Sequence, residues 1–258
     1  MLRPNEVRLA LAEGRTVYGL FCAIPSPSLV EMIGCAGYDF VIVDTEHTGV
    51  DPQELENLIR AAESVALTPF VRVPKGDSGA ILRALDAGAM GVVIPHVQDA
   101  ETARAAVYAS RYAPEGMRSL NSGRQPGFGE LVLTEYISRA NAEIMVVVMI
   151  EDKQAVEAID SILKVPGIDM VLEGAADLSQ SYGVPWQIRH PQVLDALAHI
   201  AKRSQAHNVR YCAIPRTPDD HSAWLEQGVR CFVLGEDRSV TARALRAHLN
   251  IHRSAEGS

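Results

Sequence analysis

The sequence predicts an α/β protein folded as a single (β/α)8 barrel, the TIM barrel, with its active site at the C-terminal ends of the strands. Short apolar runs rich in β-branched residues alternate with helical segments over 258 residues, and this fold typically takes about 250. Continuous apolar runs flanked by helices indicate strands that are buried on both faces, as in a parallel sheet. A doubly wound open sheet is the alternative, but no G-x-G-x-x-G follows the first strand.

Eight apolar runs are expected to be strands, each followed by a helix. They occupy residues 17–24, 39–44, 69–73, 91–96, 144–150, 170–172, 209–214 and 231–234. Turn and cap residues bound the helices, as where Asp51 and Pro52 begin one and Gly88 ends the next. The clearest helices are expected at 1–15, 52–65, 78–87, 131–140, 191–207, 218–227 and 239–252.

One connection, residues 111–142, is too long for a simple barrel loop. Long loops in compact domains are usually functional. This one carries Arg118 and Arg124 and leads into the short helix at 131–140. A subunit contact or surface flap and a role over the active site are equally good interpretations.

Composition and charge exclude several classes of function. The net charge of -8 argues against a nucleic-acid partner or an anionic membrane surface, which require clustered Lys and Arg. No apolar run reaches the roughly 18 residues of a membrane span, and the first 15 residues lack the apolar core of a signal peptide. We therefore expect a cytoplasmic protein.

The four cysteines carry no metal-site or redox signature. None forms a C-x-x-C pair, and three lie in strand-like apolar runs, which indicates buried reduced thiols. They are Cys22, Cys35, Cys212 and Cys231.

Two carboxylates anchor the candidate active site. Glu151 follows the strand at 144–150, and Asp177 comes shortly after the strand at 170–172. The carboxyl ends of parallel strands open onto one crevice, where ligands bind. Other polar residues are expected at the same mouth, namely Asp44, Glu46, His47, Arg72, His96, Glu173 and Glu236.

These residue types suit the binding of a 2-keto acid and the stabilisation of an enolate beside it. Arg72 can grip a carboxylate with two charge-assisted hydrogen bonds. The two anchoring carboxylates, with water, suit Mg²⁺ or Mn²⁺. His47 can transfer protons near neutral pH, and Asp44, three residues earlier, can orient it. Backbone N–H groups of Gly174, Ala175 and Ala176 can hold an oxyanion.

From Tyr18 to His248 the chain resembles the HpcH/HpaI aldolase family of the phosphoenolpyruvate/pyruvate superfamily. The matching motifs are Asp44-Thr45-Glu46-His47, Val71-Arg72, Leu85-Asp86-Ala87-Gly88-Ala89, Tyr112-Ala113-Pro114-Glu115-Gly116-Met117-Arg118, Glu151 and Ala176-Asp177-Leu178-Ser179. The resemblance implies a class II aldolase with Glu151 and Asp177 as metal ligands. It also implies Arg72 as the keto-acid binder and His47 with Asp44 as the acid–base pair. Family members are expected to form dimers that exchange the last helix, assembled further into hexamers.

Several positions depart from the usual aldolase pattern. Met149 replaces a glutamine, Ala175 replaces the proline of Gly-Pro-Ala-Asp, Thr48 replaces a glycine, and His96 replaces an apolar residue. With the 121–129 loop, these departures resemble the siderophore-pathway citrate synthase branch, of the staphyloferrin B type. That resemblance implies a metal-independent enzyme that condenses acetyl-CoA with oxaloacetate and supplies citrate for siderophore biosynthesis.

The resulting hypothesis gives each residue a role. Arg72 grips oxaloacetate, while His47 and His96 polarise the keto group or the thioester carbonyl. Glu151 takes the methyl proton of acetyl-CoA. Arg118 and Arg124 meet the CoA phosphates, although a solvated or interfacial role is equally consistent with the sequence.

Two other functions remain open at this point. The first is a class II aldolase that uses Mg²⁺ or Mn²⁺ to cleave a 4-hydroxy-2-keto acid to pyruvate and an aldehyde. The second is a non-catalytic regulator that binds a keto acid or citrate.

Overall fold

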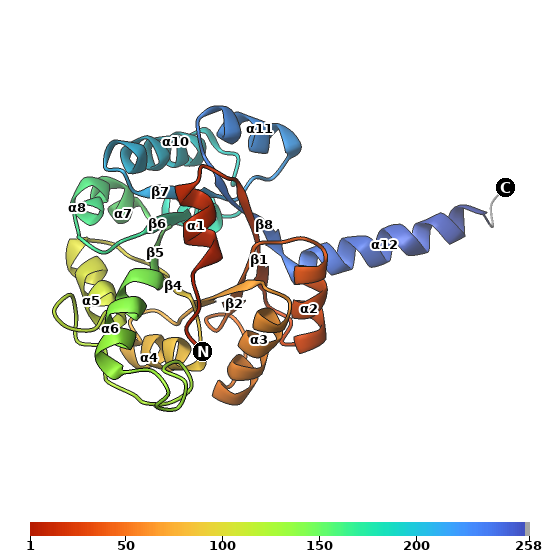
Figure 1. The fold of residues 1–258 in the computed structure, drawn as a ribbon. Helices are drawn as coiled ribbons and strands as arrows, with labels where there is room; N and C mark the ends of the chain where they lie inside the picture. Colours follow the sequence, from red (N-terminus) through yellow and green to blue (C-terminus); the bar gives the residue numbers. More distant parts are fainter. Residues whose placement is uncertain (256–258) are drawn as a thin grey trace.

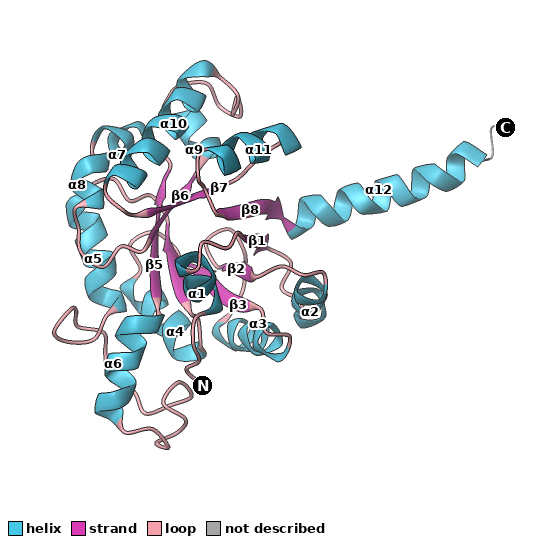
Figure 2. Ribbon diagram, turned by 45° about the horizontal axis from the view of Figure 1, so that its top comes forward, coloured by secondary structure: helices cyan, strands magenta, loops and turns pink. Residues whose placement is uncertain are grey.

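Eight parallel strands pair in chain order and close into a barrel, which confirms the predicted (β/α)8 fold. The computed structural model describes residues 1–255, and Figures 1 and 2 show the strands ringed by helices. The strands are β1 (Val17–Cys22), β2 (Phe40–Asp44), β3 (Thr68–Arg72), β4 (Gly91–Ile94), β5 (Met145–Ile150), β6 (Met170–Glu173), β7 (Arg210–Ala213) and β8 (Cys231–Glu236).

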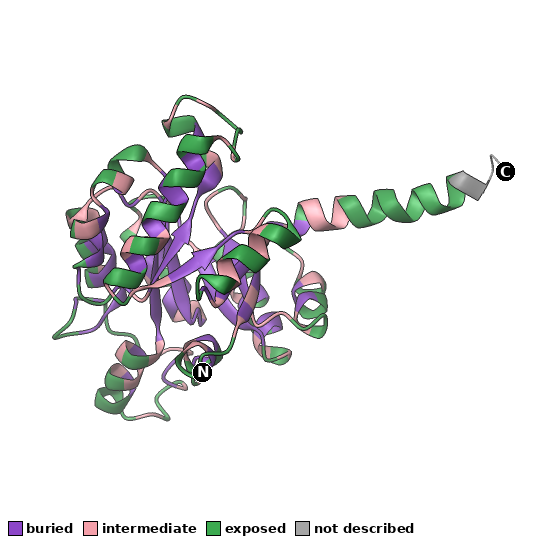
Figure 3. Ribbon diagram, turned by 90° about the horizontal axis from the view of Figure 1, so that it is seen from above, coloured by how far each residue is buried: buried purple, intermediate pink, exposed green. Residues whose placement is uncertain are grey.

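The barrel closes where β1 pairs with β8, with Val17 opposite Cys231. Close packing inside requires a glycine in β1, because a Cβ on Gly19 would lie 2.2 Å from the Phe40 ring. Cys22, Cys212 and Cys231 are buried in β1, β7 and β8, as their apolar surroundings predicted. The strands are buried along almost their whole length (Figure 3), so the centre of the barrel is a packed core.

The helices other than α12 surround the barrel (Figure 1). They are α1 (Glu6–Ala12), α2 (Pro27–Cys35), α3 (Pro52–Ser64), α4 (Ser78–Ala87), α5 (Ala100–Ser110), α6 (Leu133–Glu143), α7 (Lys153–Glu157), α8 (Ile159–Leu163), α9 (Ala175–Ser181), α10 (Pro191–Ala206), α11 (Pro218–Glu226) and α12 (Asp237–Ala255). The first helix is shorter than the expected 1–15, because the Asn5 side chain caps it at its start by accepting from the backbone N–H of Arg8. The last helix is longer than the expected 239–252.

The long connection and the N-terminal segment contact each other at the amino-terminal end of the barrel, away from the mouth. The backbone N–H of Leu2 donates to the carbonyl of Gln125, at 3.0 Å. The side chain of Asn5, just before α1, donates to the carbonyl of Met90 at the start of β4, at 2.9 Å. The interpretation of residues 111–142 as a cover for the active site is therefore wrong.

Helix α12 projects away from the barrel into solvent (Figures 1 and 3). Its root is fixed by Asp237, whose buried carboxylate accepts from the backbone N–H groups of Ala23 and Ile24, both at 3.0 Å. Further along, Leu245, Leu249 and Ile251 expose 67%, 47% and 69% of their surface. Among residues 1–255, no helix combines the length and the apolar character that a membrane crossing requires.

Candidate active site

Side chains from the carboxyl ends of the strands enclose a cavity of about 350 Å³ at the mouth of the barrel. Six residues expected at the mouth line it, namely Asp44, His47, Arg72, Ala176, Asp177 and Glu236. Three residues that were not predicted complete the lining, namely Gln180, Trp186 and Arg238.

The partner of Asp44 is Arg72. The two residues are neighbours in register on β2 and β3. The Arg72 Nε donates to Oδ1 at 3.0 Å and Nη2 donates to Oδ2 at 2.7 Å, in a nearly buried bidentate pair. Burial of Asp44 opposes its ionisation, but the hydrogen bonds and charge of Arg72 outweigh burial and lower the pKa of Asp44. The guanidinium also lies 4.7 Å from the centre of the Phe21 ring.

The prediction that Asp44 orients the His47 imidazole is wrong. The Asp44 carboxylate accepts from the backbone N–H groups of Glu46 and His47, at 3.0 and 3.3 Å. The His47 ring, 59% exposed, points instead toward Glu46, with 3.5 Å between Nε2 and Oε2. Asp44 therefore shapes the turn and holds Arg72, whose Nη1 makes no hydrogen bond within residues 1–255 and remains available to a substrate carboxylate.

Glu46 is the central acid that sequence reasoning left without a role. Its carboxylate lies 3.5 Å from His47 Nε2, 3.6 Å from Arg72 Nε and 3.9 Å from His96 Nε2. The signal for it was its position between Asp44 and His47, directly after a strand. One carboxylate thus faces both candidate histidines and the candidate substrate-binding arginine.

His96 and Glu151 contact each other at the ends of β4 and β5, although neither lines the cavity. The backbone N–H of His96 donates to Glu151 Oε1 at 2.6 Å, and Nδ1 of the ring lies 3.5 Å from the same oxygen. His96 adopts a left-handed backbone with φ of 51°, which is uncommon for a residue other than glycine and is concentrated at functional sites. Burial raises the pKa of Glu151 to about 6. A buried carboxylate of this kind accepts a proton more readily than an ordinary glutamate.

Gly174 makes room for Glu151 and is not an oxyanion donor. A Cβ on Gly174 would lie 2.4 Å from the Cβ of Glu151 and 2.7 Å from Oε2. Its backbone N–H donates to the carbonyl of Ile150 at 3.2 Å, so the prediction that this N–H holds an oxyanion is wrong. The following residues, Ala175 and Ala176, begin α9, and Ala176 lines the cavity beside Asp177.

The carboxylates of the site could bind a divalent metal only if substrate oxygens supplied further ligands. Among residues 1–255, no group of three or more His, Cys, Asp and Glu side chains is arranged to hold a metal ion. Glu151 and Asp177 provide two carboxylates, and Mg²⁺ is often held by one or two carboxylates together with substrate oxygens and water. These two residues would hold Mg²⁺ or Mn²⁺ if a bound keto acid completed the shell.

The structure does not bring Arg118 and Arg124 to the mouth. The Arg118 side chain is fully buried, donates to Asp86 at 2.8 Å and packs over the Tyr112 ring. Arg124 pairs with Glu63 and donates to the carbonyl of Ala87, near the amino-terminal end of the barrel. Both cations already have partners, so the expectation that they bind CoA phosphates is wrong.

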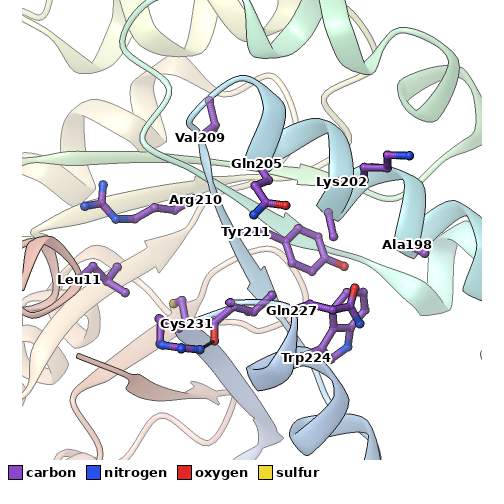
Figure 4. A pocket seen from close by; sticks show the side chains of 14 residues that line it. Leu11, Ala198, Lys202, Gln205, Val209, Arg210, Tyr211, Trp224, Gln227 and Cys231 are labelled. Atoms are coloured by element: carbon purple, nitrogen blue, oxygen red, sulfur yellow. Dashed lines mark hydrogen bonds between the residues drawn. The ribbon is translucent and has the colours of Figure 1, made fainter. Parts of the chain in front are cut away.

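A larger cavity lies outside the mouth, between α10 and α11. It measures about 560 Å³, and Tyr211, Trp224, Gln205 and Lys202 line it (Figure 4). Glu173 lies buried beside a neighbouring cavity of about 230 Å³ and accepts a hydrogen bond from the Tyr211 hydroxyl at 2.5 Å. Burial raises the pKa of Glu173 to about 7. Glu173 ends β6, but its side chain faces α10 and α11 and does not line the active-site cavity, so its expected place at the mouth is wrong.

The family model for HpcH/HpaI aldolase/citrate lyase matches residues 17–244. The chain belongs to this family. The crystal structure of the citrate synthase SbnG is 44% identical, with a TM-score of 0.92 over 98% of this chain and 99% of that one. The 5-keto-4-deoxy-D-glucarate aldolase of Shigella boydii serotype 18 is 33% identical over 238 residues, 92% of each chain.

A more distant structure shares the fold alone. The citrate lyase β subunit from M. tuberculosis, complexed with oxaloacetate and magnesium, is 17% identical with a TM-score of 0.55. The matched region covers 87% of this chain and 93% of that one.

Membership of the family establishes the general activity. The chain is an enzyme that forms or cleaves carbon–carbon bonds. The alternative of a non-catalytic regulator is therefore wrong.

Proposed function

We propose that this enzyme condenses acetyl-CoA with oxaloacetate to give citrate and CoA, and that the reaction needs no metal. The observation that carries the proposal is the contact chain from Glu46 through His96 to Glu151. It supplies an acid–base set around a keto-acid site in a chain 44% identical to a citrate synthase along nearly its whole length.

Substrate binding begins at Arg72. Its Nε and Nη2 are held by Asp44, so the free Nη1 receives a carboxylate of oxaloacetate. The Asp44 pair fixes the guanidinium before substrate arrives, which reduces the entropy lost on binding. The keto oxygen then lies toward His47 and His96, which donate hydrogen bonds to it as negative charge develops.

The proton chemistry centres on Glu151. Its carboxylate takes a proton from the methyl group of acetyl-CoA, and the resulting enolate carbon attacks the keto carbon of oxaloacetate. The new alkoxide takes a proton from a histidine, and water then cleaves the thioester to release citrate and CoA. A pKa of about 6 leaves Glu151 largely ionised at pH 8, yet basic enough to assist the abstraction.

The test is CoA release from acetyl-CoA plus oxaloacetate, followed with a thiol reagent in the presence and absence of EDTA. Release that persists in EDTA, with citrate identified by mass spectrometry, supports the proposal. His96→Ala should lose most of this activity, and citrate formation at the wild-type rate would remove His96 from the mechanism.

The alternative is a metal-dependent class II aldolase, which the 33% identical glucarate-derivative aldolases favour. Glu151 and Asp177 would then hold Mg²⁺ or Mn²⁺ together with the keto acid. No CoA release, combined with pyruvate release from a 4-hydroxy-2-keto acid that EDTA abolishes, would select this alternative.

We further propose that α12 is exchanged between subunits of a homo-oligomer. The exposed apolar side chains along the projecting helix support this, because isolated helices seldom keep such residues in water.

A further inference from the structure

Three residues that line the active-site cavity have no role in the proposed catalysis. Gln180 comes from α9, Trp186 from the segment between α9 and α10, and Arg238 from the root of α12. Arg72, which receives the keto acid in the proposed reaction, lines the same cavity. The three unused residues are therefore available to the second substrate.

Trp186 is an exposed ring on an unfavourable backbone. The residue is 82% exposed, although it lines the cavity, and its φ is 64°, in the left-handed region that favours glycine. The turn around it is fixed, since Val184 N–H donates to Ser179 at 2.9 Å and Gln187 N–H donates to Val184 at 3.0 Å. Strained residues held by their surroundings are concentrated at ligand sites.

Arg238 adds a cation to the lining of the same cavity. Its Nη2 donates to the carbonyl of Ala23 at 2.8 Å, and its backbone N–H donates to Asp237 at 2.7 Å. Gln180 adds a side-chain amide, which can both donate and accept. The lining of this cavity therefore includes an indole ring, an amide and a cation.

We propose that Trp186, Gln180 and Arg238 form the subsite for the arm of the acyl-CoA substrate. This inference rests on the proposed citrate synthase function. The pantetheine chain packs against the indole and exchanges hydrogen bonds with Gln180, while Arg238 attracts the anionic nucleotide end as it leaves the cavity. An arm of alternating alkyl and amide groups matches this surface, whereas the small, doubly charged keto acid does not.

Binding can be tested apart from turnover, because the chain has only two tryptophans. Trp224→Phe leaves Trp186 as the sole reporter, and Trp186→Phe leaves Trp224, which lies in α11 with its ring against Tyr211. Titration with CoA, and with pantetheine to exclude adenine absorption, should quench Trp186 fluorescence saturably and leave Trp224 unchanged. Quenching of Trp224 alone, or of neither residue, overturns the inference.

Kinetics give the second test. Trp186→Gly removes the ring at a position where the backbone favours glycine, so folding should be retained. We expect the KM for acetyl-CoA to rise about tenfold while kcat and the KM for oxaloacetate change less than twofold. Acetyl-pantetheine should show the same dependence on Trp186.

Phe128→Gly is the matched control. Phe128 is likewise an exposed aromatic residue, at 75%, with φ of 55°, but it lies in the loop at the other end of the barrel. An equal effect in both variants, or none in Trp186→Gly, overturns the inference while the proposed function stands. If the wild type forms no citrate and CoA still quenches Trp186, the subsite stands and the proposed reaction falls.

Discussion

Glu151→Gln should make the enzyme more stable and nearly inactive. The pKa of Glu151 is raised from 4.5 to about 6 by burial, and the residue is only 2% exposed. The folded state therefore disfavours the ionised form by about 1.5 × 1.36, or ~2 kcal/mol. Glutamine keeps an oxygen for the His96 N–H and removes the charge.

The raised pKa of Glu151 also sets how folding stability changes with pH. Because the folded-state pKa is above the unfolded value, the protonated acid favours folding below pH 4.5, and this contribution is lost as the pH rises through about 6. The free energy of unfolding of Glu151→Gln should therefore exceed that of the wild type by about 2 kcal/mol at pH 8 and by about 1 kcal/mol at pH 5. Thermal unfolding at both pH values would measure the gain, and the pH 8 value corresponds to a Tm increase of roughly 4–8 °C.

Activity should move in the opposite direction. Removal of a general base lowers kcat by about 10²–10⁴-fold. Glu173→Gln is the matched control, since burial also raises that pKa, to about 7, but the side chain lies in the helix layer. It should raise stability at pH 8 without loss of turnover. An unchanged or lower Tm for Glu151→Gln, or an equal gain at the two pH values, would refute the reasoning.

Three further variants test the site and the assembly. Asp44→Asn removes the bidentate partner of the mostly buried Arg72, so the KM for the keto acid should rise and stability should fall by roughly 1.5–3 kcal/mol, measured by kinetics and denaturant unfolding; unchanged values would remove Asp44 as the support of Arg72. Glu46→Gln should lower kcat about tenfold and shift the acid limb of the pH–rate profile, with unfolding unaffected; a wild-type profile would leave Glu46 without a role. Leu245→Asp on α12 should shift the oligomer toward smaller species in analytical ultracentrifugation, whereas Met32→Asp, at an equally exposed position on α2, should not; identical masses would contradict helix exchange.

The sequence by itself determined the barrel and the face that carries the site. Runs of β-branched residues and the turn residues between them act locally, so their pattern is visible without the fold. Parallel strands all end on one face, which is why acids, histidines and an arginine placed after different strands meet at one mouth. The burial of three cysteines was predicted from the same apolar runs.

The tertiary structure decided which of these side chains are partners. Asp44 and His47 are close in the chain, yet Asp44 binds Arg72, because the register of β2 and β3 sets the two side by side. Glu46 became central only once three strand ends were placed around it. Sequence distance therefore identified the wrong partner for Asp44.

Only the fold could place the long connection and the last helix. No partner for Arg118 or Arg124 could be predicted from the sequence. In the fold, each pairs with an acid more than 30 positions away in the chain, at the end of the barrel opposite the mouth. Amphipathic patterning could not show that α12 leaves its own barrel. Such outcomes depend on long-range packing, which residue spacing does not encode.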